Sequence, residues 1–149
     1  MTIRAYQQWA LGLSAAGAAF SGYLSATKLL TAGCAFNEPC PYFFGIPACY
    51  IGFALFLTLF LISLIAFLQK RSDAGVARAN LAASALGTLF AGYYVVVEVV
   101  SWFRDGFATY GLGLSTCTYG FVLFVVLLIL SANAHRSAAT PPPAESMTT

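Results

Sequence analysis

Four cysteines are the residues of this sequence best suited to covalent chemistry. Cys34 and Cys40 are separated by five residues in the segment Gly33-Cys-Ala-Phe-Asn-Glu-Pro-Cys-Pro41. An irregular segment of this length can bend back on itself, and a disulfide requires that the two Cα atoms lie within about 7 Å. The pair can therefore act either as the structural staple of a loop or as a redox pair that shuttles electrons.

Cys49 and Cys117 each lie at the predicted start of an apolar helix. Cys49 follows Pro47, a residue favoured early in helices, and Cys117 follows Ser115, a good N-cap residue. A thiolate at a helix N-terminus is stabilised by the helix dipole and by unpaired N–H groups, so it attacks disulfides readily. The two residues could instead form a static disulfide or stay as inert buried thiols, because free cysteine is often buried.

The sequence favours neither a metal site nor nucleic-acid binding. No two cysteines have C-x-x-C spacing, and the single histidine, His135, is predicted at the opposite end of the molecule. The net charge is only +2 and is spread along the loop ends.

Two charged residues fall inside predicted helices. Lys28 and Glu98 follow Gly22 and Gly92, respectively, by six residues, so we expect them at similar depth. A charge near the centre of a bilayer costs about 3 kcal/mol or more, so such residues usually carry a partner or a function. Lys28 and Glu98 are therefore a candidate ion pair, and Glu98 is also a candidate proton relay.

Long apolar stretches must position these residues. Of the 149 residues 60% are hydrophobic and 8% are charged, whereas soluble domains have roughly 25% charged residues. Stretches of about 20 apolar residues match the ~30 Å hydrocarbon core of a membrane. We therefore predict an all-α protein, a polytopic four-helix transmembrane bundle in the lipid bilayer, with spans at about 6–31, 47–68, 79–103 and 115–132.

The sequence also repeats itself. Residues 42–56 match residues 110–124 at an offset of 68, with Tyr, Gly, Cys, Gly, Phe, Leu and Phe in common. At an offset of 70 the pattern Gly-x-x-Phe-x-Gly-Tyr of residues 17–23 recurs at residues 87–93. We therefore predict one membrane domain, residues 1–136, made of two helical hairpins at about 5–69 and 76–133 with the same orientation, as in parallel repeats.

The basic residues predict how the chain crosses the membrane. They gather at Arg4, at Lys70, Arg71 and Arg78, and at Arg136, segments that should face the cytoplasm. We expect an integral protein of a bacterial inner membrane with both termini in the cytoplasm and all four cysteines on the outer side, where disulfides persist. Residues 137–149, which contain three consecutive prolines, are predicted to form a disordered cytoplasmic tail.

One segment resembles a known family. The pattern Cys34-x5-Cys40, followed by Phe44-Gly45-Ile46-Pro47 and Gly52, is similar to the vitamin K epoxide reductase family over about residues 34–52. The resemblance implies that a loop pair, here Cys34 and Cys40, accepts electrons from a thioredoxin-like partner. The family then passes them to a Cys-x-x-Cys at the outer start of the fourth helix, which reduces a bound quinone.

The sequence departs from that pattern at the fourth helix. It reads Ser115-Thr-Cys-Thr-Tyr-Gly120, so Cys117 stands where one member of the family's pair belongs and the other cysteine is missing. Our hypothesis is that Cys49, the residue equivalent to Cys117 in the first repeat, supplies the missing sulfur from the second helix.

The leading functional hypothesis is therefore a membrane thiol–disulfide oxidoreductase that exchanges reducing equivalents between a thioredoxin-like partner and a membrane quinone. Its predicted catalytic residues are the four cysteines. Aromatic residues near the outer ends of the helices are the predicted quinone-binding set: Phe44, Tyr50, Phe53, Tyr119 and Phe121.

Two alternatives remain open. A non-catalytic membrane subunit or assembly factor could keep the scaffold and use its cysteines only in structural disulfides, and the missing cysteine of the fourth helix favours this reading. A transporter is a weaker alternative, because only Lys28 and Glu98 could line a polar path.

Overall fold

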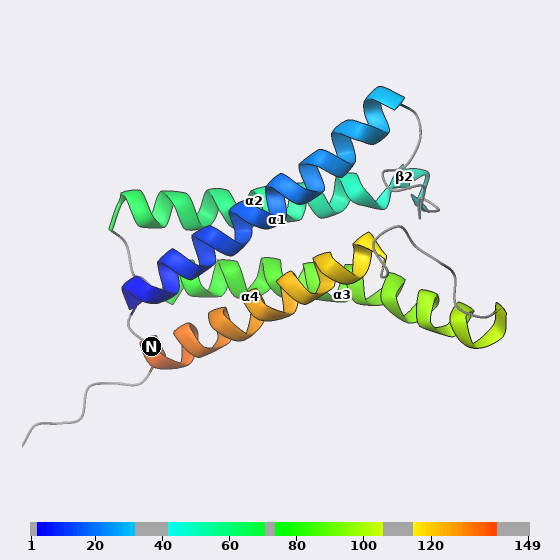
Figure 1. Ribbon diagram of the computed structural model, residues 1–149. Coiled ribbons are helices and arrows are strands. Elements are labelled where there is room, and N and C mark those ends of the chain that lie inside the picture. Colours follow the sequence, from blue (N-terminus) through cyan, green and yellow to red (C-terminus); the bar gives the residue numbers. More distant parts are fainter. Residues whose placement is uncertain (1–2, 32–41, 71–73, 106–114, 140–149) are drawn as a thin grey trace, which may run out of the picture.

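The described part of the chain consists of four helices and one short hairpin (Figure 1). The computed structural model describes residues 3–31, 42–70, 74–105 and 115–139. The elements are α1 (Ile3–Thr31), β1 (Tyr42–Phe43), β2 (Ile46–Pro47), α2 (Ala48–Leu68), α3 (Ala74–Asp105) and α4 (Thr116–Ala139). The predicted all-α class is confirmed. Helix α4 continues three residues into the predicted tail, and the rest of that tail lies outside the described residues.

Three of the described helices are long and apolar enough to cross a membrane. They are α2, residues 75–104 of α3 and residues 116–137 of α4. Helix α1 has 29 residues, but serine, threonine, glycine and alanine make it less hydrophobic than the other helices, and it is not among the three candidate spans. The structure is thus consistent with an integral membrane protein with three candidate spans.

The helices run alternately up and down the bundle (Figure 1). Helices α2 and α4 begin, and α1 and α3 end, at one end of the molecule, which we call the outer end. At the opposite, inner end lie the exposed side chains of Arg4, Lys70, Arg78 and Arg136. Basic residues therefore mark the inner end, whereas the described cysteines lie at the outer end.

Each hairpin packs through a glycine of its first helix and a phenylalanine of its second. A Cβ atom on Gly17 would collide with the ring of Phe56, and a Cβ atom on Gly87 would collide with the ring of Phe124. These pairs are equivalent in the internal repeat, so both hairpins use the same close contact between backbone and ring.

A second pair of contacts follows the same repeat, one or two turns toward the outer end. A Cβ atom on Gly22 would lie 3.1 Å from Phe53, and one on Gly92 would lie 3.1 Å from Phe121. The contacts within the α1–α2 hairpin are thus reproduced within the α3–α4 hairpin.

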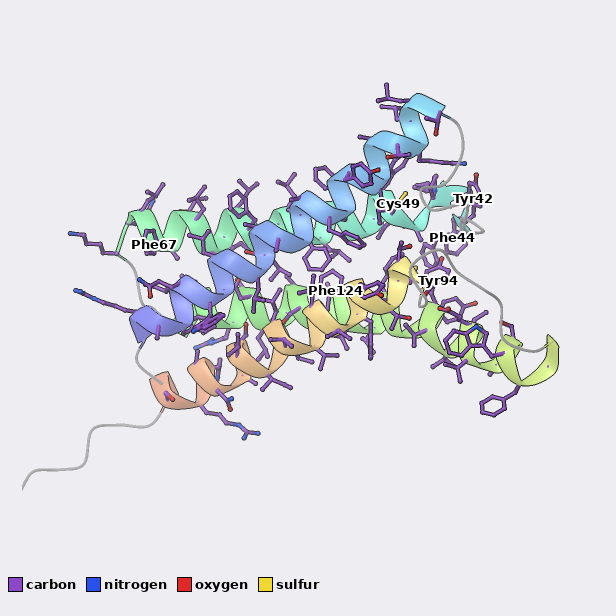
Figure 2. The ribbon with its side chains drawn as sticks, in the orientation of Figure 1. Tyr42, Phe44, Cys49, Phe67, Tyr94 and Phe124 are labelled. Carbon is purple, nitrogen blue, oxygen red and sulfur yellow. The ribbon has the colours of Figure 1, made fainter. Side chains whose placement is uncertain are left out.

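The two hairpins meet at the centre of the bundle. The rings of Phe56 and Phe124 stack with their centroids 4.0 Å apart and their planes 12° apart (Figure 2). Both side chains are fully buried, as are Leu59 and Leu127 one turn further along α2 and α4. Equivalent residues of the two repeats therefore face each other in the core.

Polar side chains join all four helices near the inner end. Asn80 Nδ2 donates hydrogen bonds of 3.2 Å to Tyr6 Oη and to Ser63 Oγ, and Tyr6 Oη lies 3.2 Å from Ser131 Oγ. All four residues are buried. Each helix contributes one of these four residues, which we call the inner network.

A β-hairpin that the sequence did not predict precedes α2. Tyr42 pairs with Pro47 and Phe43 with Ile46, and the two-residue turn between them has φ of 49° at Phe44 and 84° at Gly45. Positive φ at both central residues is typical of the type I′ turn that closes tight hairpins. The turn leaves Phe44 92% exposed.

Candidate functional site

Glu98 lies at the outer end, half-buried between α3 and the start of α4. Its Oε2 atom accepts a short hydrogen bond from Ser115 Oγ. Ser115 caps α4, because its Oγ atom accepts a hydrogen bond of 3.4 Å from the backbone N–H of Thr118 and lies 3.1 Å from Thr118 Oγ1. The cap of α4 therefore fixes the position of one carboxylate oxygen of Glu98.

Two polar atoms, one on Glu98 and one on Tyr94, have no hydrogen-bond partner among the described residues. They are Glu98 Oε1 and the hydroxyl of Tyr94, and both are buried. Tyr94 precedes Glu98 by one helical turn, so the two side chains lie on the same face of α3. Buried polar atoms are nearly always paired in folded proteins, so these two atoms make this helix face a candidate functional region.

Cys117 lies beside this face of α3. It is the second residue of α4 and follows Ser115, whose hydroxyl is hydrogen-bonded to Glu98, by two residues. We call Tyr94, Glu98, Ser115 and Cys117 the outer site. It combines a thiol, a carboxyl group and a phenol at the start of an apolar helix.

Cys49 occupies the equivalent position in the first hairpin. It is the second residue of α2, and its carbonyl oxygen accepts a hydrogen bond of 3.2 Å from Ser25 Oγ. The preceding N-cap, Pro47, offers no side-chain hydrogen bond to the helix. Cys49 and Cys117 therefore share the helix-start geometry that the sequence predicts, but their surroundings differ.

Within the described residues, Cys49 and Cys117 are partly buried and neither belongs to a disulfide. A static disulfide between them, one of the alternatives raised by the sequence, is thus not formed in this structure. Cys34 and Cys40 lie outside the described residues, and so does the predicted pairing between them.

The structure does not bring Lys28 and Glu98 together. Lys28 Nζ lies 5.7 Å from the centre of the Tyr42 ring, a cation–π distance, whereas Glu98 is bonded to Ser115. The physical reason is the helix arrangement: α1 packs against α2 and α4, and α3 packs against the same two helices. Helices α1 and α3 therefore lie on opposite sides of the bundle, so Lys28 and Glu98 can lie at the same depth without touching.

The predicted quinone-binding rings are dispersed. Phe53 and Phe121 pack onto Gly22 and Gly92 inside the two hairpins. Tyr119 makes an edge contact with Phe20 of α1, with ring centres 6.4 Å apart. Phe44 is at the exposed turn of the β-hairpin, and Tyr50 is partly buried near the start of α2. Phe53, Phe121 and Tyr119 thus pack against Gly22, Gly92 and Phe20, respectively.

A different set of rings approaches the outer site. The ring centres of Phe90 and Tyr94 are 5.3 Å apart, and those of Phe43 and Phe90 are 5.6 Å apart. The β-hairpin thereby contacts α3 through Phe43, and the series of rings continues from Tyr94 to its neighbour Tyr93, with ring centres 5.2 Å apart.

Sequence reasoning identified Glu98 and Cys117 but missed Tyr94 and Ser115 as their partners. The spacing of Tyr94, Glu98 and Trp102, four residues apart, was an available signal for one polar helix face. The hydrogen bond to Ser115 depends on how α3 packs against α4 and could not be predicted from spacing along one helix.

No protein-family model matches the chain, and no match was found among curated proteins or solved structures.

Proposed function

We propose that this protein is a membrane thiol–disulfide oxidoreductase that exchanges reducing equivalents between a thioredoxin-like partner and a membrane quinone. The observation that carries the proposal is the placement of two thiols, Cys49 and Cys117, as the second residues of α2 and α4 at the outer end. Both lie in the first turn of a helix, where the backbone N–H groups have no partner within the helix.

The proposed topology has four crossings, with α1 as the fourth. The buried hydroxyls of α1 are satisfied within the helix, since Ser14 and Ser21 donate hydrogen bonds of 2.6 Å to the carbonyl oxygens of Ala10 and Gly17. Satisfied hydroxyls reduce the cost of placing a serine-rich helix in an apolar environment. The exposed basic residues of the inner end support a cytoplasmic position for that end and for both termini.

In the proposed reaction Cys34 and Cys40 exchange with the partner through a mixed disulfide. The Cys34 and Cys40 thiols left by that exchange would reduce a Cys49–Cys117 disulfide and become a disulfide again. Re-formation of the Cys49–Cys117 disulfide then releases two electrons and two protons. A quinone supplies the acceptor chemistry, because its reduction to a hydroquinone takes up two electrons and two protons. The unpaired hydroxyl of Tyr94 and the unpaired Oε1 atom of Glu98 fit such a ligand, whose oxygens need hydrogen-bond partners.

The exchange step can be tested by trapping. The full-length protein in nanodiscs would be mixed with a reduced thioredoxin in which serine replaces the resolving cysteine. We expect a mixed disulfide on a non-reducing gel for the wild type and for Cys49→Ser. The double variant Cys34→Ser/Cys40→Ser should give none.

The opposite result supports the alternative function. If thioredoxin forms no mixed disulfide with any variant, and mass spectrometry finds Cys34 joined to Cys40 regardless of the added reductant, the cysteines are structural. The protein would then be a non-catalytic membrane subunit or assembly factor.

A further inference from the structure

At the outer end, hydrogen bonds between helices are found at the starts of the two helices that carry cysteines. Ser25 Oγ of α1 donates a hydrogen bond of 3.2 Å to the carbonyl oxygen of Cys49 in α2. The N-cap of α4, Ser115, is bonded to Glu98 of α3. Each of these helix starts is therefore tied to the helix that precedes it in the chain.

Ser25 differs from the other buried serines of α1. Ser14 and Ser21 each donate a hydrogen bond of 2.6 Å to the carbonyl oxygen four residues earlier in the same helix. This bond is the usual one for a serine inside a helix. Ser25 is also buried, but its hydroxyl bonds to α2. The Ser25 hydroxyl therefore joins two helices.

The contacts shared by the two hairpins do not explain this bond. Ser25 corresponds in the second hairpin to Val95, whose side chain has no hydrogen-bond donor. The second hairpin is therefore packed without a hydroxyl at this position. Its own tie, the bond of Glu98 to Ser115, comes from the position that Lys28 occupies in the first hairpin.

The start of α2 has little else within its own sequence to fix it. Its N-cap, Pro47, offers no side-chain hydrogen bond to the helix. Cys49 is the second residue of α2, so the place of its thiol depends on the backbone of the first turn. Ser25 bonds to that backbone at Cys49 itself. A thiol held in one place reacts with a second thiol at a lower cost in entropy.

We propose that Ser25 is a positioning residue for Cys49. Its hydroxyl holds the first turn of α2, so that the Cys49 thiol stays in place for disulfide formation with Cys117. The role of that disulfide rests on the proposed function, whereas the hold of Ser25 on Cys49 can be measured without it.

The hold on Cys49 can be tested by alkylation of the reduced full-length protein in nanodiscs, with Cys117 as the internal reference. Cys49 is partly buried, so its reaction with iodoacetamide requires local opening. Ser25→Ala should raise the alkylation rate of Cys49 about 3- to 10-fold, the effect of one hydrogen bond between membrane helices, and leave that of Cys117 unchanged. Ser21→Ala is the matched control, because its hydroxyl bonds within α1. Ser25→Thr keeps a hydroxyl and should restore the wild-type rate.

The effect on disulfide formation can be tested in a glutathione redox buffer, in a background in which serine replaces the two loop cysteines. The thiols of Cys49 and Cys117 exchange with glutathione disulfide: one disulfide bond breaks, one forms, and two glutathione thiols are released. Ser25→Ala should lower the equilibrium constant of this exchange about 3- to 10-fold relative to Ser21→Ala.

Three outcomes would overturn the inference. They are equal alkylation rates of Cys49 in Ser25→Ala and Ser21→Ala, an equal rise for Cys49 and Cys117 in Ser25→Ala, and an equilibrium constant that Ser25→Ala leaves unchanged. If wild-type Cys49 and Cys117 form no disulfide at any glutathione ratio, the proposed function is contradicted. The alkylation rates alone would then decide whether Ser25 holds Cys49.

Discussion

The two hairpins share their core and differ at their outer ends. In both, a glycine of the first helix faces a phenylalanine of the second, Gly17 with Phe56 and Gly87 with Phe124. At the outer end, the second helix of the second hairpin, α4, has a side-chain N-cap, Ser115, and the second helix of the first hairpin has none. The Ser115 hydroxyl is also hydrogen-bonded to the carboxyl group of Glu98. In the first hairpin the corresponding N-cap is a proline.

The difference between the hairpins lies outside their shared core. Packing between hairpins constrains the core, so equivalent residues keep equivalent contacts. The outer end is released from that constraint, and there the second hairpin holds Tyr94 and Glu98 where the first has Leu24 and Lys28. The two thiols are thus alike in helix position and unlike in environment.

The largest change in the free energy of unfolding is expected at Asn80, a buried position at which the two hairpins differ. Asn80 corresponds to Ala10 of the first hairpin, so Asn80→Ala makes the two hairpins alike at this position. The change removes two hydrogen bonds and leaves Tyr6 and Ser63 buried without them. We expect the free energy of unfolding to fall by about 2–3 kcal/mol in a detergent unfolding assay.

Asn133→Ala, on an exposed position near the inner end of α4, is the control for that experiment and should have little effect. If Asn80→Ala and Asn133→Ala lower the free energy of unfolding equally, the inner network does not stabilise the four-helix bundle.

The next largest change in the free energy of unfolding tests whether the two glycine–phenylalanine contacts are equivalent. A methyl group on Gly17 or Gly87 meets a buried phenylalanine ring, so Gly17→Ala and Gly87→Ala should each destabilise by about 1–3 kcal/mol. Gly12→Ala is the control, because a Cβ atom there meets nothing within 4 Å, and alanine favours the helix. Losses that differed by more than about 1 kcal/mol between Gly17→Ala and Gly87→Ala would contradict equivalent packing.

A smaller effect is expected from the cap that distinguishes the second hairpin. Ser115→Ala removes the hydroxyl that both caps α4 and bonds Glu98, and N-cap replacements cost about 1 kcal/mol. Hydrogen exchange should increase in the first turn of α4 and not in α2. Unchanged exchange around Thr118 would show that the hydroxyl does not stabilise the helix start.

The smallest effect concerns the β-hairpin before α2. Phe44 has a positive φ and makes little contact with the rest of the described chain beyond the ring of Phe43, so Phe44→Gly should change the free energy of unfolding by no more than about 1 kcal/mol, in the stabilising direction. Phe43→Ala, which removes the contact with Phe90, should destabilise instead. A clear loss of stability in Phe44→Gly would indicate that the exposed ring has a partner.

Hydrophobic stretches and repeated letters carried most of the information about the fold. Helix positions follow from apolar runs, and the paired glycines and phenylalanines predicted two similar hairpins, whose contacts the structure contains. The β-hairpin was missed because its strands have only two residues each and its turn places a phenylalanine where glycine or asparagine is usual.

The candidate site was only partly predictable. The charge of Glu98 stood out in an apolar helix, but its partner is Ser115 rather than Lys28, because helix neighbours and not depth decide which side chains meet. Likewise, aromatic letters near the outer ends could not reveal that Phe53 and Phe121 are used in packing while Phe90 and Tyr94 are aligned toward the site.

The most direct measurement is the redox state of Cys49 and Cys117 in the native membrane before and after addition of a quinone. Differential alkylation and mass spectrometry under non-reducing conditions would follow both residues while menadione reduction is monitored by absorbance. The account predicts that the two thiols are lost together, that a peptide pair linked through Cys49 and Cys117 appears, and that one menadione is reduced for each link. If both residues remain thiols after menadione is added, or if menadione is reduced without linking them, the proposed role of these two cysteines is wrong.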